Sequence, residues 1–261
     1  MTGFFESLAR RSREVSSLVC VGLDPDASRH RVEDVAAYNR RVVEATLPFA
    51  ACYKPNIAFY EQFGLAGLEA LKKTLEAIPP GTPVIGDMKR GDVGHTAAAY
   101  ARAAFEVWGF GAVTLSGYLG RDAVEPFLAY QDRAVYVLCR TSNPGGAEVQ
   151  NLRTRDGRPL FEQLAVTAAG WGDAVGLVVG ATAPAELRAV RGLLPEVPLL
   201  IPGVGAQGGS TAAVIEAAGD APGLTLVAAS RSVYYAGEGP EAAGEAARVL
   251  RDELNGIAGD G

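Results

Sequence analysis

Short apolar runs alternate with longer amphipathic stretches along almost the whole chain, and no other feature of the sequence constrains the fold as strongly. Runs such as VGLVV and PLLIP are continuously apolar, which is typical of parallel strands that are covered on both faces. The stretches between them have the length and periodicity of helices. About eight strands are predicted, at residues 18–24, 51–56, 83–89, 112–116, 134–140, 174–180, 198–203 and 224–230.

Eight strand–helix units are the number that closes a parallel (β/α)8 TIM barrel. Helices are predicted between the strands, and a further one at 4–13 is expected to plug the barrel bottom. A doubly wound open sheet is the competing architecture, but VGLDPDAS after the first strand lacks the G-x-G-x-x-G dinucleotide fingerprint. With no interdomain linker, residues 1–261 are expected to form one domain. The intervening helices are expected at 32–47, 67–78, 96–107, 121–130, 161–169, 185–193, 211–218 and 241–254.

Charge and composition exclude several classes of function. A net charge of −6, from 24 basic and 30 acidic residues, gives no general attraction to nucleic acid or to a membrane surface. The first 17 residues lack the apolar stretch of a signal peptide, and no later run resembles a membrane span. Cys20, Cys52 and Cys139 have no paired spacing, which indicates reduced thiols and favours the cytoplasm. With two histidines in the chain, carboxylates that bind magnesium are the only serious metal option.

Charged residues fall at the carboxyl ends of the first three predicted strands. Asp24 ends the first strand, Lys54 lies late in the second, and Asp87 and Lys89 end the third. Because side chains alternate along a strand, Asp87 and Lys89 share one face. In a barrel these four residues, the charged quartet, would lie side by side at the mouth, where TIM barrels carry their chemistry.

Such a quartet suits chemistry that develops negative charge. Each lysine stays protonated between carboxylates, and each carboxylate stays ionised beside a lysine. An ammonium group there stabilises a carbanion-like transition state and can deliver a proton. The alternative interpretation is an ion-pair network that merely closes the barrel top.

Two further segments carry polar side chains near the predicted mouth. Asp92 lies beyond the third strand, where the chain turns outward, so it could serve a neighbouring subunit; Asp92 and Thr96 could instead cap the next helix. The connection after the fifth strand, TSNPGGAEVQNLRTRDGRP, is long for a barrel loop and is a candidate substrate loop. Ser142 and Asn143 in it could bind a polar ring or simply form a turn.

The seventh strand runs into GVGAQGGST, a glycine-rich turn that includes Gly205. Backbone N–H groups before a helix bind anions, and phosphate in barrels commonly lies after strands seven and eight. Arg231 follows the eighth strand and could bind that phosphate with two hydrogen bonds. Taken alone, the glycines could form an ordinary tight turn, Arg231 could be a surface residue and Gln207 could face solvent.

Several motifs together resemble the orotidine 5′-phosphate decarboxylase family, in particular its bacterial type 2 subgroup. The resemblance extends from Val21 to Ala236, and the D-x-K-x-x-D run at 87–92 with Lys54 is its most specific part. The other matching segments are VGLDPD, YKPNIAFYEQFG, GHTAAAYA, TSNPGG, IPGVGAQGG and ASRSVYYA.

The resemblance implies that Lys89 donates a proton to C6 of the pyrimidine and that Asp87 crowds the substrate carboxylate. Lys54 and Asp24 would complete the charge array and hold ribose hydroxyls. The implied reaction converts orotidine 5′-monophosphate to uridine 5′-monophosphate and CO2 in pyrimidine biosynthesis, with no metal and no organic cofactor.

The resemblance also implies a homodimer with shared active sites. Asp92 and Thr96 would reach the partner's substrate, and Ser142 would recognise the pyrimidine edge. Gln207 and Arg231 would hold the phosphate, with the glycine-rich loop closing as a lid. The long serine loop and Val93 depart from the pattern of smaller family members.

Three other functions are open at this stage. Magnesium-dependent sugar-phosphate decarboxylases and aldolases share the D-x-K-x-x-D run, but they require an acidic ligand where this chain has Lys54, which would repel the cation. A Schiff-base aldolase would need a neutral Lys89, whereas flanking carboxylates favour its protonated form. A non-catalytic barrel that binds a phosphorylated ligand is the third.

Overall fold

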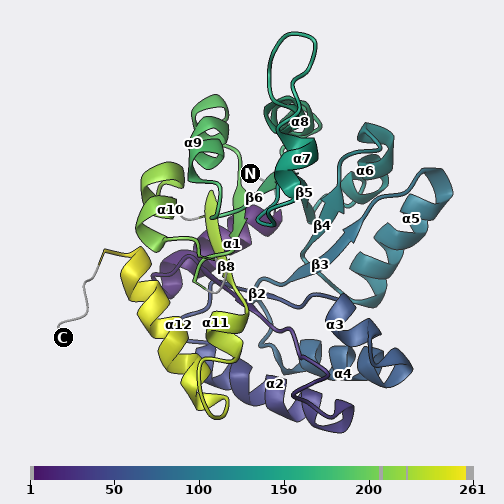
Figure 1. The fold of residues 1–261 in the computed structure, drawn as a ribbon. Helices are drawn as coiled ribbons and strands as arrows, with labels where there is room; N and C mark the ends of the chain where they lie inside the picture. The colour runs from purple at the N-terminus through teal and green to yellow at the C-terminus, as the bar shows by residue number, and fades with distance from the viewer. Residues whose placement is uncertain (1–2, 206–207, 222, 257–261) are drawn as a thin grey trace.

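The fold is a barrel of eight parallel strands surrounded by helices (Figure 1). It is seen in a computed structural model that describes residues 3–205, 208–221 and 223–256. The strands are hydrogen-bonded in the order β2-β1-β8-β7-β6-β5-β4-β3. Their bounds are β1 Val19–Gly22, β2 Cys52–Lys54, β3 Ile85–Arg90, β4 Ala112–Ser116, β5 Ala134–Arg140, β6 Val175–Val179, β7 Leu199–Pro202 and β8 Thr225–Ala229.

The two edges of this sheet, β2 and β3, meet and nearly close the barrel. The Tyr53 N–H donates to the Pro83 carbonyl at 3.0 Å, and the Asp87 N–H donates to the Pro55 carbonyl at 3.0 Å. Parallel bridges join Tyr53 to Val84 and Asn56 to Asp87. The predicted eight-stranded parallel barrel is therefore confirmed, and the open doubly wound sheet is excluded.

The helices follow the strands at nearly the predicted positions. The segment expected as one helix at 96–107 instead divides into an α-helix and a π-helical turn, η1. Three short helices that follow β2, β5 and β8 were not expected: α3 Ala58–Glu61, α7 Gly146–Gln150 and α11 Arg231–Tyr234. The others are α2 Val32–Thr46, α4 Gly64–Ala77, α5 Gly94–Arg102, η1 Ala103–Val107, α6 Arg121–Leu128, α8 Leu160–Ala169, α9 Pro184–Leu193, α10 Thr211–Ala218 and α12 Glu241–Leu254. In the described part of the chain, no helix combines the length and the apolar character needed to cross a bilayer.

Strand residues alternate between the barrel interior and the surrounding helical layer. In β5, Val135 and Val137 belong to the large core cluster that includes the helices, whereas Ala134 and Tyr136 belong to the separate interior cluster. This two-residue period determines which side chains reach the mouth, because only inward positions near the strand ends can line it.

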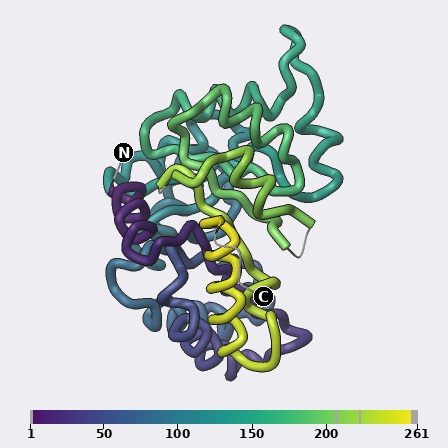
Figure 2. Tube along the Cα trace, turned by 90° about the vertical axis from the view of Figure 1, so that its left-hand side faces the viewer, coloured from purple at the N-terminus to yellow at the C-terminus, as the bar shows by residue number. Residues whose placement is uncertain are grey.

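The interior is filled from below by the N-terminal helix α1, Gly3–Glu14, which lies at the left-hand end of the barrel in Figure 2. Phe4, Phe5 and Leu8 of α1 are buried in the interior cluster. The Phe5 ring meets Tyr136 edge to face, with ring centroids 5.7 Å apart. The expected plug is therefore present, and it leaves the opposite end of the barrel for chemistry.

Candidate active site

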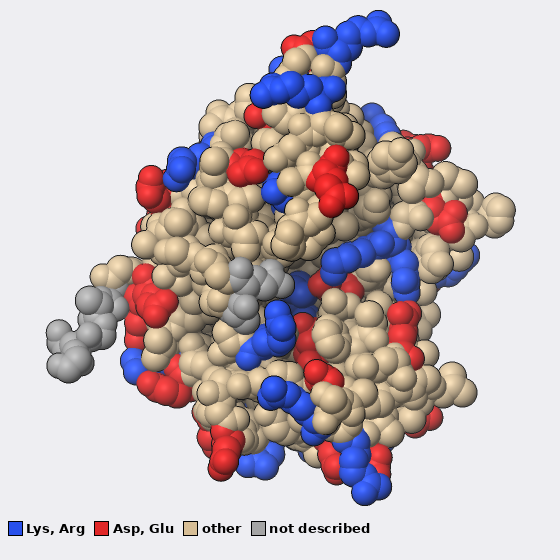
Figure 3. Space-filling view, in the orientation of Figure 1, with Lys and Arg blue, Asp and Glu red and all other residues tan. Residues whose placement is uncertain are grey.

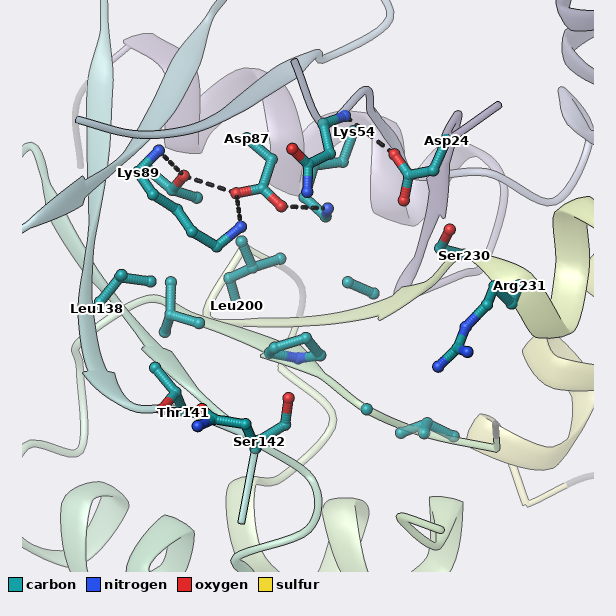
Figure 4. A pocket seen from close by; sticks show the side chains of 18 of the residues that line it. Asp24, Lys54, Asp87, Lys89, Leu138, Thr141, Ser142, Leu200, Ser230 and Arg231 are labelled. Carbon is teal, nitrogen blue, oxygen red and sulfur yellow. Dashed lines mark hydrogen bonds and ion pairs between the residues drawn. The ribbon is translucent and has the colours of Figure 1, made fainter. Parts of the chain in front are cut away.

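The charged quartet lies together at the carboxyl ends of β1, β2 and β3 (Figure 4). Asp87 is its centre, because Lys54 Nζ lies 2.9 Å from Asp87 Oδ2 and Lys89 Nζ lies 2.6 Å from Asp87 Oδ1. Asp24 Oδ1 accepts a hydrogen bond of 2.9 Å from the Asn56 N–H. Parallel pairing of Gly22 with Lys54 places Asp24 beside Lys54 at the end of the neighbouring strand.

Burial and pairing compete in deciding the charge of these groups. Lys54 and Asp87 are each only 7% exposed, and burial by itself disfavours the charged form of both. For Lys54 the Asp87 and Asp24 carboxylates outweigh burial and raise the pKa above its usual value. For Asp87 the two lysines outweigh burial and hold the pKa far below its usual range. At neutral pH the buried pair is therefore a lysinium and a carboxylate.

The end of β3 is irregular, and this irregularity shapes the site. β3 and β4 are in register at Gly86 with Val113 and again at Arg90 with Leu115, so the β3 side contains two extra residues. Lys89 within this bulge has φ +48°, a left-handed conformation that is rare for non-glycine residues and concentrates at functional sites. Simple alternation places Asp87 and Lys89 on one face, and in the structure their contact lies within the bulge.

A cavity of about 540 Å³ opens beside the quartet. Opposite the charges, its wall is apolar, formed by inward residues of β5 to β8 that include Leu138, Val178, Leu200 and Ala228. Figure 3 shows basic and acidic side chains meeting at the hollow in the centre of this face. The cavity thus combines an ionic side with an apolar side, a lining typical of sites that bind small molecules.

Ser142 lines the cavity from the loop after β5. The loop packs closely on the end of β6, because a Cβ on Gly180 would lie 2.7 Å from Ser142 Cα. The Thr182 hydroxyl donates to the Ser142 carbonyl at 2.9 Å. Only the first residues of the long connection reach the cavity; its later part contains α7 and a turn that projects from the barrel above α8 in Figure 1.

Arg231, the first residue of α11, extends into the cavity from the side of β8 (Figure 4). The part of the cavity beside Arg231 is also lined by Gly203, Val204 and Ser232. Gly205 adjoins it, since a Cβ on Gly205 would lie 3.4 Å from the Ser232 hydroxyl oxygen. The expectation for Gln207 falls outside the described residues.

Asp92 and Thr96 do not line this cavity. Asp92 Oδ1 accepts a hydrogen bond of 2.8 Å from the Val93 N–H in an exposed turn. Val93 is the N-cap residue of α5, and that position has no side-chain hydrogen bond. The interpretation of Asp92 or Thr96 as the helix cap is therefore wrong.

Most of the uncharged cavity wall was missed in the sequence, including Thr114, Leu138, Val178 and Leu200. Each occupies an inward position of its strand, so strand alternation combined with the barrel was the available signal. Among residues 3–205, 208–221 and 223–256, no group of three or more His, Cys, Asp or Glu side chains is arranged to hold a metal ion.

The fold and the site define a TIM-barrel enzyme whose ionic and apolar groups meet at the carboxyl ends of the strands. The model of the orotidine 5′-phosphate decarboxylase / HUMPS family matches residues 17–247. The chain belongs to this family.

Relatives and solved structures extend this assignment over almost the full length. The chain is 46% identical to an orotidine 5′-phosphate decarboxylase of Thermomicrobium roseum, covering 97% of this chain and 95% of the relative. Its structure is similar to that of Leishmania donovani OMP decarboxylase, with TM-score 0.87, 41% identity and coverage of 98% and 99%. It also matches L. donovani UMP synthase, with TM-score 0.89 and 42% identity, covering 98% of this chain and 57% of that longer one.

Proposed function

We propose that this chain decarboxylates orotidine 5′-monophosphate to uridine 5′-monophosphate and CO2, with Lys54, Asp87 and Lys89 carrying the chemistry. The observation that carries the proposal is the position of Asp87 between two lysine ammonium groups, 2.9 and 2.6 Å away, at the mouth of the barrel. Family membership and a curated decarboxylase at 46% identity over 97% of the chain support the same activity.

The quartet accounts for the reaction without an electron sink. The substrate carboxylate lies against Asp87, so ground-state repulsion is relieved as the C6–carboxylate bond breaks and CO2 leaves. The electron pair stays on C6, where the Lys89 ammonium stabilises it. Lys89 then gives its proton to C6 and is reprotonated from solvent. Lys54 keeps Asp87 ionised throughout.

Binding groups around the quartet hold the rest of the nucleotide. Arg231, with Gln207 and Gly205 of the glycine-rich loop, holds the phosphate, while Asp24 binds the ribose and Ser142 the pyrimidine edge. Phosphate binding far from C6 can drive closure of the glycine-rich loop and contribute to transition-state stabilisation.

A homodimer completes the site by placing Asp92 and Thr96 in the partner's cavity. Exposed apolar side chains support this arrangement: Tyr118 is 85% exposed, Val93 48% and Leu119 45%. They occupy two adjacent loops, since a Cβ on Gly91 would lie 3.4 Å from Leu119 Cδ1. Exposed apolar side chains on adjacent loops are typical of protein interfaces.

The domain organisation and the cellular compartment are part of the same proposal. A single barrel domain over residues 1–261 is part of the proposal, supported by the single sheet to which every strand of the described residues belongs. The three cysteines are buried and free, which supports a reducing compartment, the cytoplasm.

Magnesium-dependent sugar-phosphate decarboxylation is the second candidate, and Lys54 argues against it. Its side chain is 9% exposed and paired with Asp87, so a divalent cation at the same strand end would meet an ammonium group in a poorly solvated place.

The test is turnover of orotidine 5′-monophosphate by the purified chain, followed as loss of the substrate's absorbance. The proposed function predicts turnover that is unchanged by EDTA and by borohydride treatment with substrate. EDTA-sensitive turnover of a sugar phosphate would establish the second candidate instead. Stabilisation by the nucleotide without any turnover would identify a binding module and overturn the proposal.

A further inference from the structure

Thr114 contacts two of the proposed catalytic residues without itself being charged. It lies on β4 with an inward side chain that is 2% exposed. Its hydroxyl accepts a hydrogen bond of 3.0 Å from the backbone N–H of Lys89. The same hydroxyl donates a hydrogen bond of 2.8 Å to Asp87 Oδ1. One oxygen therefore connects the backbone of the proposed proton donor to the carboxylate beside it.

These contacts occur where β3 leaves regular geometry. Thr114 is the one β4 residue that faces the three residues of β3 between Gly86 and Arg90. Within that bulge Lys89 adopts φ +48°, a conformation that persists only when surrounding contacts hold it. The Lys89 N–H is not part of the β3–β4 ladder of backbone hydrogen bonds. It donates its hydrogen bond to the Thr114 hydroxyl instead.

The hydroxyl also limits where the Lys89 ammonium can lie. Asp87 Oδ1 accepts both the Thr114 hydroxyl and Lys89 Nζ, the latter at 2.6 Å, while Asp87 Oδ2 accepts Lys54 Nζ at 2.9 Å. A carboxylate held by three donors has little freedom to rotate. Lys89 needs this restraint more than Lys54 does, since its side chain is 47% exposed whereas that of Lys54 is 9% exposed.

We propose that Thr114 is a positioning residue for the decarboxylation, acting through the backbone of Lys89 and the carboxylate of Asp87. The inference rests on the proposed function. Without the hydroxyl, the Lys89 N–H has no acceptor and the bulge relaxes, so that the ammonium moves away from the reacting carbon. Because the groups that bind phosphate, ribose and pyrimidine are untouched, the loss falls on kcat and not on KM.

The experiment compares Thr114→Val, which keeps the shape and removes the hydroxyl, with Thr114→Ser, which keeps the hydroxyl. Thr114→Val is expected to lower kcat about 10- to 100-fold, the effect of losing a hydrogen bond to a charged group. KM for orotidine 5′-monophosphate should stay within about 2-fold, and Thr114→Ser should restore kcat to within about 3-fold of wild type.

Two controls separate positioning from a loss of folded protein. Calorimetric titration with uridine 5′-monophosphate counts competent sites, and its stoichiometry should be unchanged in Thr114→Val. Thr225→Val removes another buried strand hydroxyl, 1% exposed and hydrogen-bonded to the Ala218 carbonyl at 3.3 Å, outside the cavity. This variant should keep the wild-type kcat.

The inference is overturned if Thr114→Val retains wild-type kcat, or if its kcat falls only in proportion to the number of competent sites. Failure of Thr114→Ser to recover activity would also overturn it. Absence of turnover in the wild-type chain would instead refute the proposed function, so the two failures are distinguishable.

Discussion

Lys54 and Asp87 form an ion pair between adjacent strands, with Nζ 2.9 Å from Oδ2 and each side chain only 9% exposed. Each residue stays charged at this depth because oppositely charged groups surround it, the other member of the pair first among them. The pair therefore links catalysis to folding, since the groups that create the electrostatic field of the site also have to be accommodated in the core.

Removing one member of this pair should destabilise the protein. Asp87→Ala leaves the Lys54 ammonium buried with a reduced set of partners, and the expected loss is about 3 kcal/mol in the free energy of unfolding. Lys54→Met combined with Asp87→Leu should recover most of that loss, because an apolar pair of similar volume needs no compensation. Urea unfolding monitored by circular dichroism measures both. A double variant no more stable than Asp87→Ala would contradict the prediction.

The free energy of unfolding should depend on pH through the titration of Asp87. Its folded pKa is depressed by Lys54 and Lys89 despite burial, so its contribution is complete above the unfolded pKa of about 4 and is lost as the pH falls below it. Between pH 6 and pH 3 the wild type should lose about 1 kcal/mol more than Asp87→Asn. Unfolding in urea at the two pH values provides the comparison. Parallel pH dependences for both proteins would rule out this role.

Lys89→Ala should abolish decarboxylation while the fold stays intact. Lys89 supplies the proton and part of the charge stabilisation, so a fall in kcat of at least about 1000-fold is expected. Its side chain is 47% exposed, and its loss should leave the melting temperature nearly unchanged. Near-normal kcat would end the assignment of Lys89 as the proton donor.

Complementation tests the shared site. Asp92→Ala and Lys89→Ala are each expected to be inactive, but a mixed dimer contains one site with both native residues. After equal mixing and random subunit exchange, about a quarter of wild-type activity should return, because half of the dimers contain one intact site of two. Mass spectrometry of differently tagged chains confirms exchange. Confirmed exchange without recovered activity would exclude a shared site.

Gly180→Ala should disturb the loop that carries Ser142. The new Cβ would lie 2.7 Å from Ser142 Cα and 2.9 Å from Ser142 Cβ, so the loop has to move away from the cavity. The expected effect is about a 10-fold rise in KM, if one pyrimidine contact is lost. Gly192→Ala in α9 is the matched control, because a Cβ there has no atom within 4 Å. Equal KM values for the two variants would refute the role of this close approach.

Much of the site was predictable because its signals were local. Asp24, Lys54 and Asp87 stand at the ends of apolar runs, and the closed barrel alone brings such ends together. What the sequence could not reveal depends on contacts between distant segments. The left-handed backbone of Lys89 follows from a mismatch between β3 and β4, and no pattern within either strand indicates it.

The predicted helices differ from the observed ones at several positions, because the sequence pattern does not contain the information that decides them. The helix expected at 96–107 shares the amphipathic periodicity of α5, but the periodicity does not distinguish an α-helix from the π-helical turn at Ala103–Val107. The short helices α3, α7 and α11 are too brief to show a period. For Asp92 and Thr96, residue type suggested helix capping, whereas Val93 occupies that position in an extended conformation.

The plug formed by α1 has a consequence for how the reaction ends. Phe5, Leu8 and Tyr136 occupy the centre of the barrel below the charged residues and are almost completely excluded from solvent, so these side chains block the barrel at the end opposite the mouth. With that end blocked, carbon dioxide released at C6 would leave through the mouth, where the nucleotide enters. In the proposed mechanism, a loop closure that shields the carbanion from water would also retain the gas, and reopening would then release both products.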